Sequence, residues 1–204
     1  MSVRVLVATR NPKKLVELQR ILDEALGTGE VILLHLGDVP PYDEVPETGL
    51  TFADNALLKA REGAVHTGLP TVADDSGISV DALNGMPGVF SARWAGGHGD
   101  DAANLNLVLA QISDVDDAHR GARFVCAAAL VLPDGREFTV SGEMLGHLAR
   151  APRGTNGFGY DPIFVPEGLT ITSAEMEPAD KDTISHRGKA FRALAPLIHT
   201  YVTP

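Results

Sequence analysis

Two adjacent carboxylates, Asp74 and Asp75, follow a short apolar stretch and precede Ser76 and Gly77. Like charges side by side repel each other, so a nearby cation would stabilise them. Magnesium (Mg²⁺) binds one or two carboxylates together with substrate phosphates and several waters. Neighbouring strand residues point to opposite faces, so we expect one carboxylate to reach the site and the other to support it. The alternative is an Asx turn closed by Ser76 and Gly77.

Phosphate binding is the chemistry that the segment from Thr9 to Lys14 favours. A strand is predicted to lead into a helix that starts at Pro12, with Asn11 as its N-cap. The free N–H groups of a helix N-terminus attract anions, whereas Lys13 and Lys14 in the first turn oppose the helix dipole. An anion would offset these cations; the alternative is an ordinary capped helix with solvated lysines. The candidate phosphate-binding residues are Thr9, Arg10, Asn11, Pro12, Lys13 and Lys14.

A loop of glycine and aromatic residues, from Gly154 to Pro162, offers a surface for a nucleobase. Glycines such as Gly159 permit close approach of the backbone, and bases stack on rings such as Phe158 or Tyr160. Asp161 could accept a hydrogen bond from a base N–H. The alternative is a flexible loop with Phe158 in the core.

A second helix N-terminus that carries cations is predicted near the end of the chain. Ser185 can cap a final helix over 187–201, which places His186 and Arg187 at its positive end. Arg187, together with Lys181, favours an anion there. His186 could donate a hydrogen bond to a purine carbonyl or to phosphate, although a lone histidine is more often structural.

Glu47 precedes a helix predicted from Phe52 to Val65, in which Thr51 and Asp54 form a variant of the capping box. Lys59 of this helix is either solvated or directed at phosphate. Glu47 is a candidate second metal ligand, beside Asp75 as the main ligand and Asp74 as an alternative.

Apolar periodicity elsewhere predicts helices and strands that alternate, with one hairpin around Pro133-Asp134-Gly135. Because the hairpin interrupts a strict strand–helix–strand alternation, we expect an α/β fold with a mixed, partly antiparallel sheet. The expected helices cover 12–26, 52–65, 101–112 and 187–201, the last bent at Pro196, and the expected strands cover 3–8, 31–36, 71–73, 78–83, 124–132, 137–141, 143–149 and 163–165.

Composition limits the class of protein. The 204 residues, 44% hydrophobic, suit one domain over residues 1–204. The net charge of −10 disfavours broad binding to nucleic acid or acidic membranes, but a small anion can still bind where a few cations converge. The longest apolar run, Val125 to Leu132, is too short for a membrane span, and the N-terminus lacks the layout of a signal peptide. The one cysteine, Cys126, is expected to be buried and suits a reducing, cytoplasmic location.

Six segments in one order resemble the inosine/xanthosine triphosphate pyrophosphatases, and the resemblance extends from Val5 to about Leu194. Any one of these segments alone would be unspecific, but the six together are highly specific. They are Thr9-x-Asn11-x-x-Lys14, Thr51-Phe52 through Asn55-Ala56 to Lys59-Ala60, Asp74-Asp75-Ser76-Gly77, Gly88 to Arg93, Phe158 to Pro162, and Ser185 to Gly188.

The resemblance implies a two-lobed fold with a long mixed sheet flanked by helices and an active-site cleft between the lobes. It implies a homodimer and magnesium-dependent cleavage of ITP, dITP or XTP to the monophosphate and pyrophosphate. Asp75 would be the metal ligand and proton acceptor, and the segment from Thr9 to Lys14 would hold phosphates. The second metal ligand stays open. The implied nucleotide-binding residues are Ser76, Phe158, Gly159, Tyr160, Asp161, Lys181, His186 and Arg187.

Two other functions fit parts of the pattern: a nucleotide sensor without hydrolysis, and a pyrophosphatase specific for another base. The sensor would not need the Asp74–Asp75 pair. An aspartate with a pKa near 4 is a poor base at neutral pH, so we expect Asp75 to orient the attacking water more than to remove its proton. Donors such as His186 and Arg187 would favour a 6-oxo purine over adenine.

Overall fold

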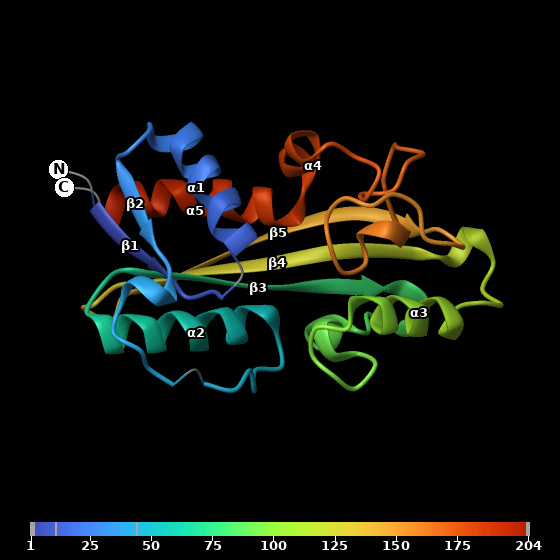
Figure 1. Cartoon of the computed structure of the whole chain (residues 1–204), viewed down its shortest axis with the longest axis horizontal. Helices are drawn as coiled ribbons and strands as arrows, with labels where there is room; N and C mark the ends of the chain where they lie inside the picture. Colours follow the sequence, from blue (N-terminus) through green and yellow to red (C-terminus); the bar gives the residue numbers. More distant parts are fainter. Residues whose placement is uncertain (1–2, 11, 44, 203–204) are drawn as a thin grey trace. The chain divides into compact units, whose positions relative to one another are not determined.

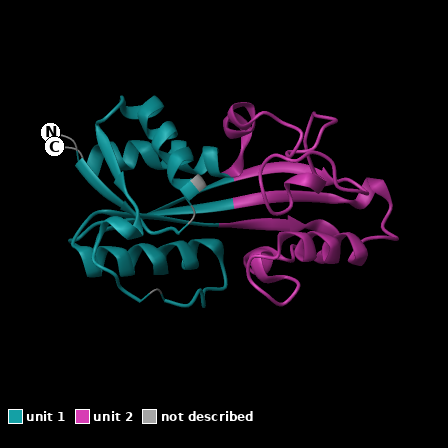
Figure 2. Ribbon diagram, in the orientation of Figure 1, with its two compact units in different colours: residues 1–75, 126–142, 187–204 teal, residues 76–125, 143–186 magenta. Residues whose placement is uncertain are grey.

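The computed structural model describes residues 3–10, 12–43 and 45–202. The chain divides into two compact units, and each is assembled from separate stretches (Figure 2). Unit 1 comprises residues 1–75, 126–142 and 187–204, and unit 2 comprises residues 76–125 and 143–186. A single domain over 1–204, and a cleft between two lobes, stay predictions.

Within the described residues, the strands form one six-stranded sheet with the order β2-β1-β3-β4-β5-β6 (Figure 1). Strand β1 pairs in parallel with β2 and β3, whereas β6 pairs antiparallel with β5. The sheet is therefore mixed, and helices flank it, which confirms the predicted α/β fold. The strands are β1 (Val3–Val7), β2 (Val31–Leu34), β3 (Thr71–Val80), β4 (Gly121–Val131), β5 (Glu137–Leu148) and β6 (Phe164–Pro166).

The helix boundaries follow local signals in the sequence. At the start of α2, the Thr51 hydroxyl accepts a hydrogen bond from the Asp54 N–H at 3.1 Å, and the Asp54 carboxylate accepts one from the Thr51 N–H at 3.2 Å. This confirms the capping box. The helix ends at Gly68, whose φ of 66° is left-handed. The helices are α1 (Pro12–Leu26), α2 (Phe52–Thr67), α3 (Asp101–Gln111), α4 (Pro178–Ile184) and α5 (His186–Val202).

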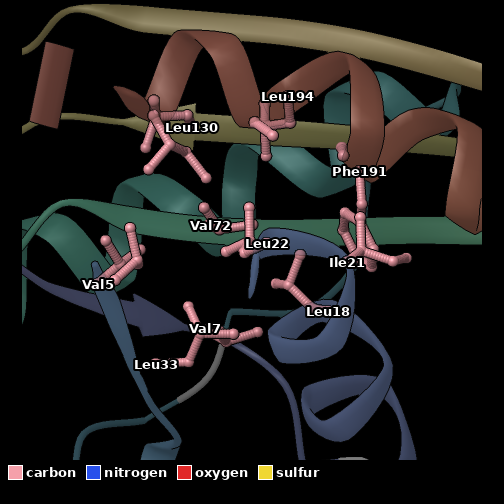
Figure 3. Close-up of a cluster of buried hydrophobic side chains, with 14 of the residues drawn as sticks. Val5, Val7, Leu18, Ile21, Leu22, Leu33, Val72, Leu130, Phe191 and Leu194 are labelled. Atoms are coloured by element: carbon pink, nitrogen blue, oxygen red, sulfur yellow. The ribbon is translucent and has the colours of Figure 1, made fainter. Parts of the chain in front are cut away.

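The core of unit 1 has two parts, because alternate strand residues face opposite sides of the sheet. Val72 and Leu130 pack against Leu22 of α1 and Leu194 of α5 (Figure 3). Their neighbours in the strands, including Ala73, pack instead against small residues of α2 such as Ala56 and Ala60. Helices α1 and α5 therefore cover one face and α2 covers the other.

Unit 2 has its own apolar core, in which α3 packs against the parts of β3 and β4 that belong to this unit. Val108 of α3 and Ile78 of β3 are fully buried there, together with Phe164 of β6. The Asp100 carboxylate caps α3 by accepting a hydrogen bond from the Ala103 N–H at 2.9 Å. In the described part of the chain, no helix has the length and hydropathy to cross a membrane.

Several predicted boundaries are wrong. Residues 71–73 and 78–83 are not two strands, because β3 runs without a break from Thr71 to Val80 and the Asp74–Gly77 segment lies inside it. The alternative of an Asx turn is therefore also wrong. Partners from other elements satisfy the two carboxylates, so these polar residues do not end the strand. Likewise, 137–141 and 143–149 belong to one strand, β5, and β2 ends at Leu34, where His35 caps a short 3-10 helix.

Helix α4 is absent from the prediction. It has seven residues, too few to display an apolar period, and Pro178 occupies its first turn. The final helix starts at His186 and contains Pro196, close to the predicted span. Asn11, the predicted N-cap of α1, lies outside the described residues.

Candidate active site

The two adjacent aspartates of β3 have different partners in unit 1. The Asp74 carboxylate lies on the face of α1 and α5, where its Oδ2 is 2.7 Å from Lys14 Nζ and 3.4 Å from Arg187 Nε. Asp75 lies on the face of α2. The alternation predicted for this pair therefore holds, with one carboxylate on each face of the sheet.

Asp74 is the centre of a buried ion cluster. Its side chain is 2% exposed. Burial alone would raise its pKa, but the charges of Lys14 and Arg187 hold that pKa well below its usual range. Arg187 also contacts Glu17 Oε2 at 3.1 Å, and these two carboxylates raise the Arg187 pKa despite its burial. The cluster ties α1 and α5 to β3 through charges on all three elements.

Cys126 borders this cluster, with its Sγ 3.9 Å from Asp74 Oδ2. Burial and the nearby carboxylate raise the pKa of the thiol far above its ordinary value. The predicted burial of the cysteine is confirmed, and its surroundings disfavour the thiolate form.

Asp75 is the more accessible of the two aspartates, with 13% of its side chain exposed. Its Oδ2 accepts a hydrogen bond from Asn55 Nδ2 at 3.1 Å, and its Oδ1 is 3.6 Å from Lys59 Nζ. Burial raises the pKa of Asp75, and the Glu47 charge adds to this effect, while Lys59 opposes it. Asp75 is thus the more basic carboxylate, and it lies where solvent can reach it.

Lys59 lies between two carboxylates. Its Nζ is 2.7 Å from Glu47 Oε1, on the loop before α2, and 3.6 Å from Asp75 Oδ1. Burial would lower the Lys59 pKa, but Asp75, Asp74 and Glu47 together raise it, so the ammonium stays charged. Among the described residues, no three His, Cys, Asp or Glu side chains form a ready metal cluster. The arrangement is a pair of carboxylates with a cation between them.

The turn between β1 and α1 opens onto a cavity of about 460 Å³ in unit 1. Thr9, Arg10 and Pro12 line it, with His35 and Tyr42 among the other lining residues. The predicted phosphate-binding turn is therefore hollowed at its surface. The side chain of the neighbouring Lys13, like Asn11, lies outside the described residues.

In unit 2, the glycine and aromatic loop is organised by Asp161. This buried carboxylate accepts hydrogen bonds from Lys181 Nζ at 2.5 Å and from the Phe158 N–H at 2.9 Å. Gly157 has a φ of 75°, and a Cβ there would collide with the Asp161 carboxylate. The loop residue must therefore be glycine for Asp161 to hold both groups.

The Phe158 ring is 40% exposed, and Lys181 Nζ lies 5.9 Å from its centroid. The alternative that placed Phe158 in the core is therefore wrong. Tyr160 is buried instead, and its hydroxyl donates a hydrogen bond to the Ser91 carbonyl at 2.8 Å. Of the two aromatic residues, Phe158 alone presents a ring surface to solvent. The intervening Gly159 donates its N–H to Asp101 Oδ2 at 2.8 Å.

The remaining predicted site residues differ in their burial and in their contacts. The buried His186 ring stacks on Phe124 at 4.9 Å between centroids, at the first position of α5. Ser76 is half-buried in β3. Arg187, predicted to face the ligand, has its guanidinium in the ion cluster with Asp74 and Glu17. A contact between Arg187 and a base stays a prediction.

Sequence reasoning gave no role to Asn55 or Glu17. Asn55 is a fully buried amide beside the small residues of α2, one turn before Lys59. A polar residue on an otherwise apolar helix face was the available signal. Glu17 lies one turn after Lys14 in α1, but its partner Arg187 is 170 residues away, and no local pattern indicates that pairing.

A sequence profile of the Ham1 family matches residues 5–197. The chain is 61% identical over 200 residues to a dITP/XTP pyrophosphatase of Mycobacteroides abscessus, covering 98% of this chain and 97% of that protein. It is 64% identical over 195 residues to a dITP/XTP pyrophosphatase of Nocardia farcinica, with coverages of 96% and 94%.

Solved structures agree with the fold. A crystal structure described as a nucleoside-triphosphatase or dITP/XTP pyrophosphatase from Mycobacterium abscessus has a TM-score of 0.79 at 62% identity, covering 95% of this chain and 99% of that one. A HAM1 protein from Coxiella burnetii has a TM-score of 0.86 at 40% identity, with coverages of 97% and 99%. The structural similarity therefore extends over nearly the whole chain.

Proposed function

This chain belongs to the Ham1 family, and from that membership and its site we propose that it hydrolyses non-canonical purine nucleoside triphosphates such as dITP, ITP and XTP. The products are the monophosphate and pyrophosphate. The observation that carries the proposal is the Asp75–Lys59–Glu47 arrangement, a basic carboxylate and a cation beside a second carboxylate. The names of the relatives supply the substrate class.

The donor set fits magnesium. Two carboxylates that already accommodate the Lys59 ammonium between them can accommodate a divalent cation nearby, and magnesium needs only one or two carboxylates when phosphates complete its shell. We assign Asp75 as its main ligand and Glu47 as the second. Asp74 is committed to Lys14 and Arg187, so it serves as a support. When bound, the metal ion neutralises phosphate charge and draws electrons from the reacting phosphoryl group.

Residues of unit 1 bind the phosphates, neutralise the charge of the leaving group and orient the attacking water. Thr9, Arg10 and the start of α1 hold phosphate oxygens through N–H groups and positive charge. Lys59 neutralises charge that develops on the departing pyrophosphate. Asp75 orients the water that attacks the α-phosphorus, and its raised pKa makes it a better acceptor for the proton that the water loses. The water oxygen forms the new bond, and the bond between the α-phosphorus and the bridging oxygen breaks.

Base recognition falls to residues of unit 2. The exposed Phe158 ring is the stacking surface, and Lys181 and Asp161 hold its loop in shape. His186 donates to the 6-oxo group of hypoxanthine or xanthine, whereas the 6-amino group of adenine would leave that donor unpaired. Arg187 is the further donor predicted to contact the base, and Asp74 and Glu17 hold its guanidinium.

Further parts of the proposal concern the assembly and the cell. We propose a homodimer in the cytoplasm, acting on small nucleotides and on neither nucleic acid nor membranes. The net charge of −10 supports the last point.

A substrate panel tests the function. Pyrophosphate and monophosphate release is measured from ITP, XTP, dITP, ATP, GTP and dUTP, with magnesium and with EDTA. We expect magnesium-dependent release of both products from ITP, dITP or XTP, with ATP and GTP slow. Rapid hydrolysis of dUTP alone would indicate another base specificity. Release of single phosphates, or no turnover, would contradict the proposal.

A further inference from the structure

We propose that Asn55 is a positioning residue that joins the loop carrying Glu47 to the strand carrying Asp75, and so fixes how the two carboxylates face Lys59. The inference rests on the proposed function for its kinetic consequence, although its geometric part can be tested without substrate. All the residues concerned belong to unit 1.

Asn55 makes one hydrogen bond on each side of its amide. Its Oδ1 accepts from the Gly49 N–H at 2.7 Å, and its Nδ2 donates to Asp75 Oδ2 at 3.1 Å. A backbone N–H can only donate and an ionised carboxylate can only accept, so the amide has a single orientation that satisfies both. Since the side chain is fully buried, water cannot replace either bond without opening the structure.

A second connection runs in parallel with the first. Lys59, one helical turn after Asn55, joins Glu47 Oε1 to Asp75 Oδ1. The loop segment 47–49 is thus tied to α2 at two points, and each tie continues to a different oxygen of Asp75. Asn55 binds Asp75 Oδ2, so that Asp75 Oδ1 remains directed toward the Lys59 ammonium. Without Asn55, the Asp75 carboxylate could rotate and the loop could move away from Lys59.

The approach of the loop to Asn55 requires a glycine. A Cβ on Gly49 would lie 2.6 Å from Asn55 Oδ1 and 2.6 Å from Asp54 Cβ. The Asp54 atom belongs to the capping box at the start of α2 and has little room to move. Gly49→Ala therefore disrupts the bond between the loop and Asn55 from the loop side, without substituting any residue that touches Asp75.

Asn104 provides a matched control. It is also a buried asparagine of a helix, 1% exposed, and its Oδ1 accepts a hydrogen bond from a loop N–H, that of Ala95, at 2.7 Å. It lies in α3 of unit 2, whereas Asp75 belongs to unit 1, and its bond to Ala95 does not involve Asp75. Asn104→Ala should therefore reproduce the loss of a buried loop-to-helix bond without disturbing the carboxylate pair.

The test compares Asn55→Ala, Asn55→Asp, Gly49→Ala and Asn104→Ala by their melting temperatures and by three further measurements. These are kcat and KM for ITP, binding of Mn²⁺ to the nucleotide-free protein by electron paramagnetic resonance, and hydrogen exchange of the Gly49 amide by NMR. For Asn55→Ala we expect kcat and Mn²⁺ affinity to fall about 10- to 100-fold, the range for residues that orient metal ligands. Gly49 amide exchange should accelerate, while the KM for ITP changes little.

The other variants separate the two halves of the connection. Asn55→Asp keeps an acceptor for the Gly49 N–H, so the Gly49 amide should stay protected from hydrogen exchange. The new carboxylate would repel that of Asp75, so kcat should fall. Gly49→Ala should lower Mn²⁺ affinity through the displaced loop. Asn104→Ala should lower the melting temperature and leave kcat and Mn²⁺ binding as in the wild type.

The proposal is overturned if Asn55→Ala matches Asn104→Ala in kcat and Mn²⁺ binding, or if Gly49 stays protected in Asn55→Ala. Should Asn55→Ala fail to fold, kcat and Mn²⁺ affinity of Asn55→Asp and Gly49→Ala decide instead, and values equal to those of Asn104→Ala overturn the proposal. If the wild type cleaves no nucleoside triphosphate, the proposed function fails, but the exchange and Mn²⁺ measurements still decide whether Asn55 joins the loop to Asp75.

Discussion

Asp74 and Asp75 are consecutive in β3, yet Asp74 Oδ2 lies 2.7 Å from Lys14 on one face of the sheet, and Asp75 Oδ1 lies 3.6 Å from Lys59 on the other. Their pKa values shift in opposite directions, down for Asp74 and up for Asp75. The same strand therefore carries a carboxylate that stabilises the fold and a carboxylate that folding makes more basic. Stability and chemistry should respond separately to substitution at these two positions.

Asp74→Asn should destabilise the protein by about 3–5 kcal/mol at pH 7, because it leaves the buried charges of Lys14 and Arg187 without their carboxylate. The folded-state pKa of Asp74 lies below the unfolded value, so its stabilisation is complete above about pH 4 and is lost as the pH falls further. Urea unfolding of both proteins between pH 7 and pH 2 measures this. The difference in the free energy of unfolding between wild type and variant should narrow below about pH 4. A difference that stays constant with pH would contradict the stabilising role assigned to the ionised Asp74 carboxylate.

Asp75→Asn should lower kcat for ITP by at least about 100-fold, the lower limit for loss of an acid–base or metal-orienting group. The pKa of Asp75 is raised by folding, so its ionised form is less favourable in the folded protein at neutral pH. The variant should therefore be as stable as the wild type at pH 7, or more so, and any gain should fade as the pH falls and Asp75 protonates. Near-normal turnover with saturating magnesium would remove Asp75 from the mechanism.

Phe158→Ala should raise the KM for ITP about 5- to 150-fold, since a base stacked on an aromatic ring contributes about 1–3 kcal/mol. Stability should change little because the ring is 40% exposed. Phe90→Ala is the control, because Phe90 is 41% exposed and has Arg93 over its ring at 5.3 Å. Steady-state kinetics with ITP compares them, and equal effects of the two substitutions would argue against a stacking role for Phe158.

Thr51→Ala removes the hydroxyl that caps α2 and should cost about 1 kcal/mol of stability. Because α2 carries Asn55 and Lys59, the substitution also tests how firmly the start of this helix holds them. Thermal unfolding gives the cost, and Thr139→Ala, at an exposed position of β5, is the control. Equal melting temperatures of Thr51→Ala and Thr139→Ala would contradict the stabilising role assigned to the Thr51 cap.

Features that depend on neighbours in the chain could be predicted from the sequence. The strand and helix of the first 26 residues, the capping box at Thr51 and the burial of Cys126 follow from short patterns that the structure confirms. The alternation of side chains along a strand predicted that Asp74 and Asp75 would separate, but not which of them would be buried.

Features that depend on distant partners could not be predicted. Arg187 meets Asp74 across 113 residues of chain, so its local position at a helix N-terminus gave no indication that its charge is already neutralised. The polar segment from Asp74 to Gly77 resembled a strand end because its partners on α1, α2 and α5 were unknown. Asn55 could be assigned no role until Gly49 and Asp75 were found on either side of it.

The central claim is that water attacks the α-phosphorus of a non-canonical purine nucleoside triphosphate at the site containing Asp75. Hydrolysis of ITP in ¹⁸O-labelled water, followed by mass spectrometry of both products, tests it most directly. We predict that the label enters IMP and that the pyrophosphate contains none. Label in the pyrophosphate, or labelled orthophosphate with IDP, would show that a different bond is broken and would contradict this account.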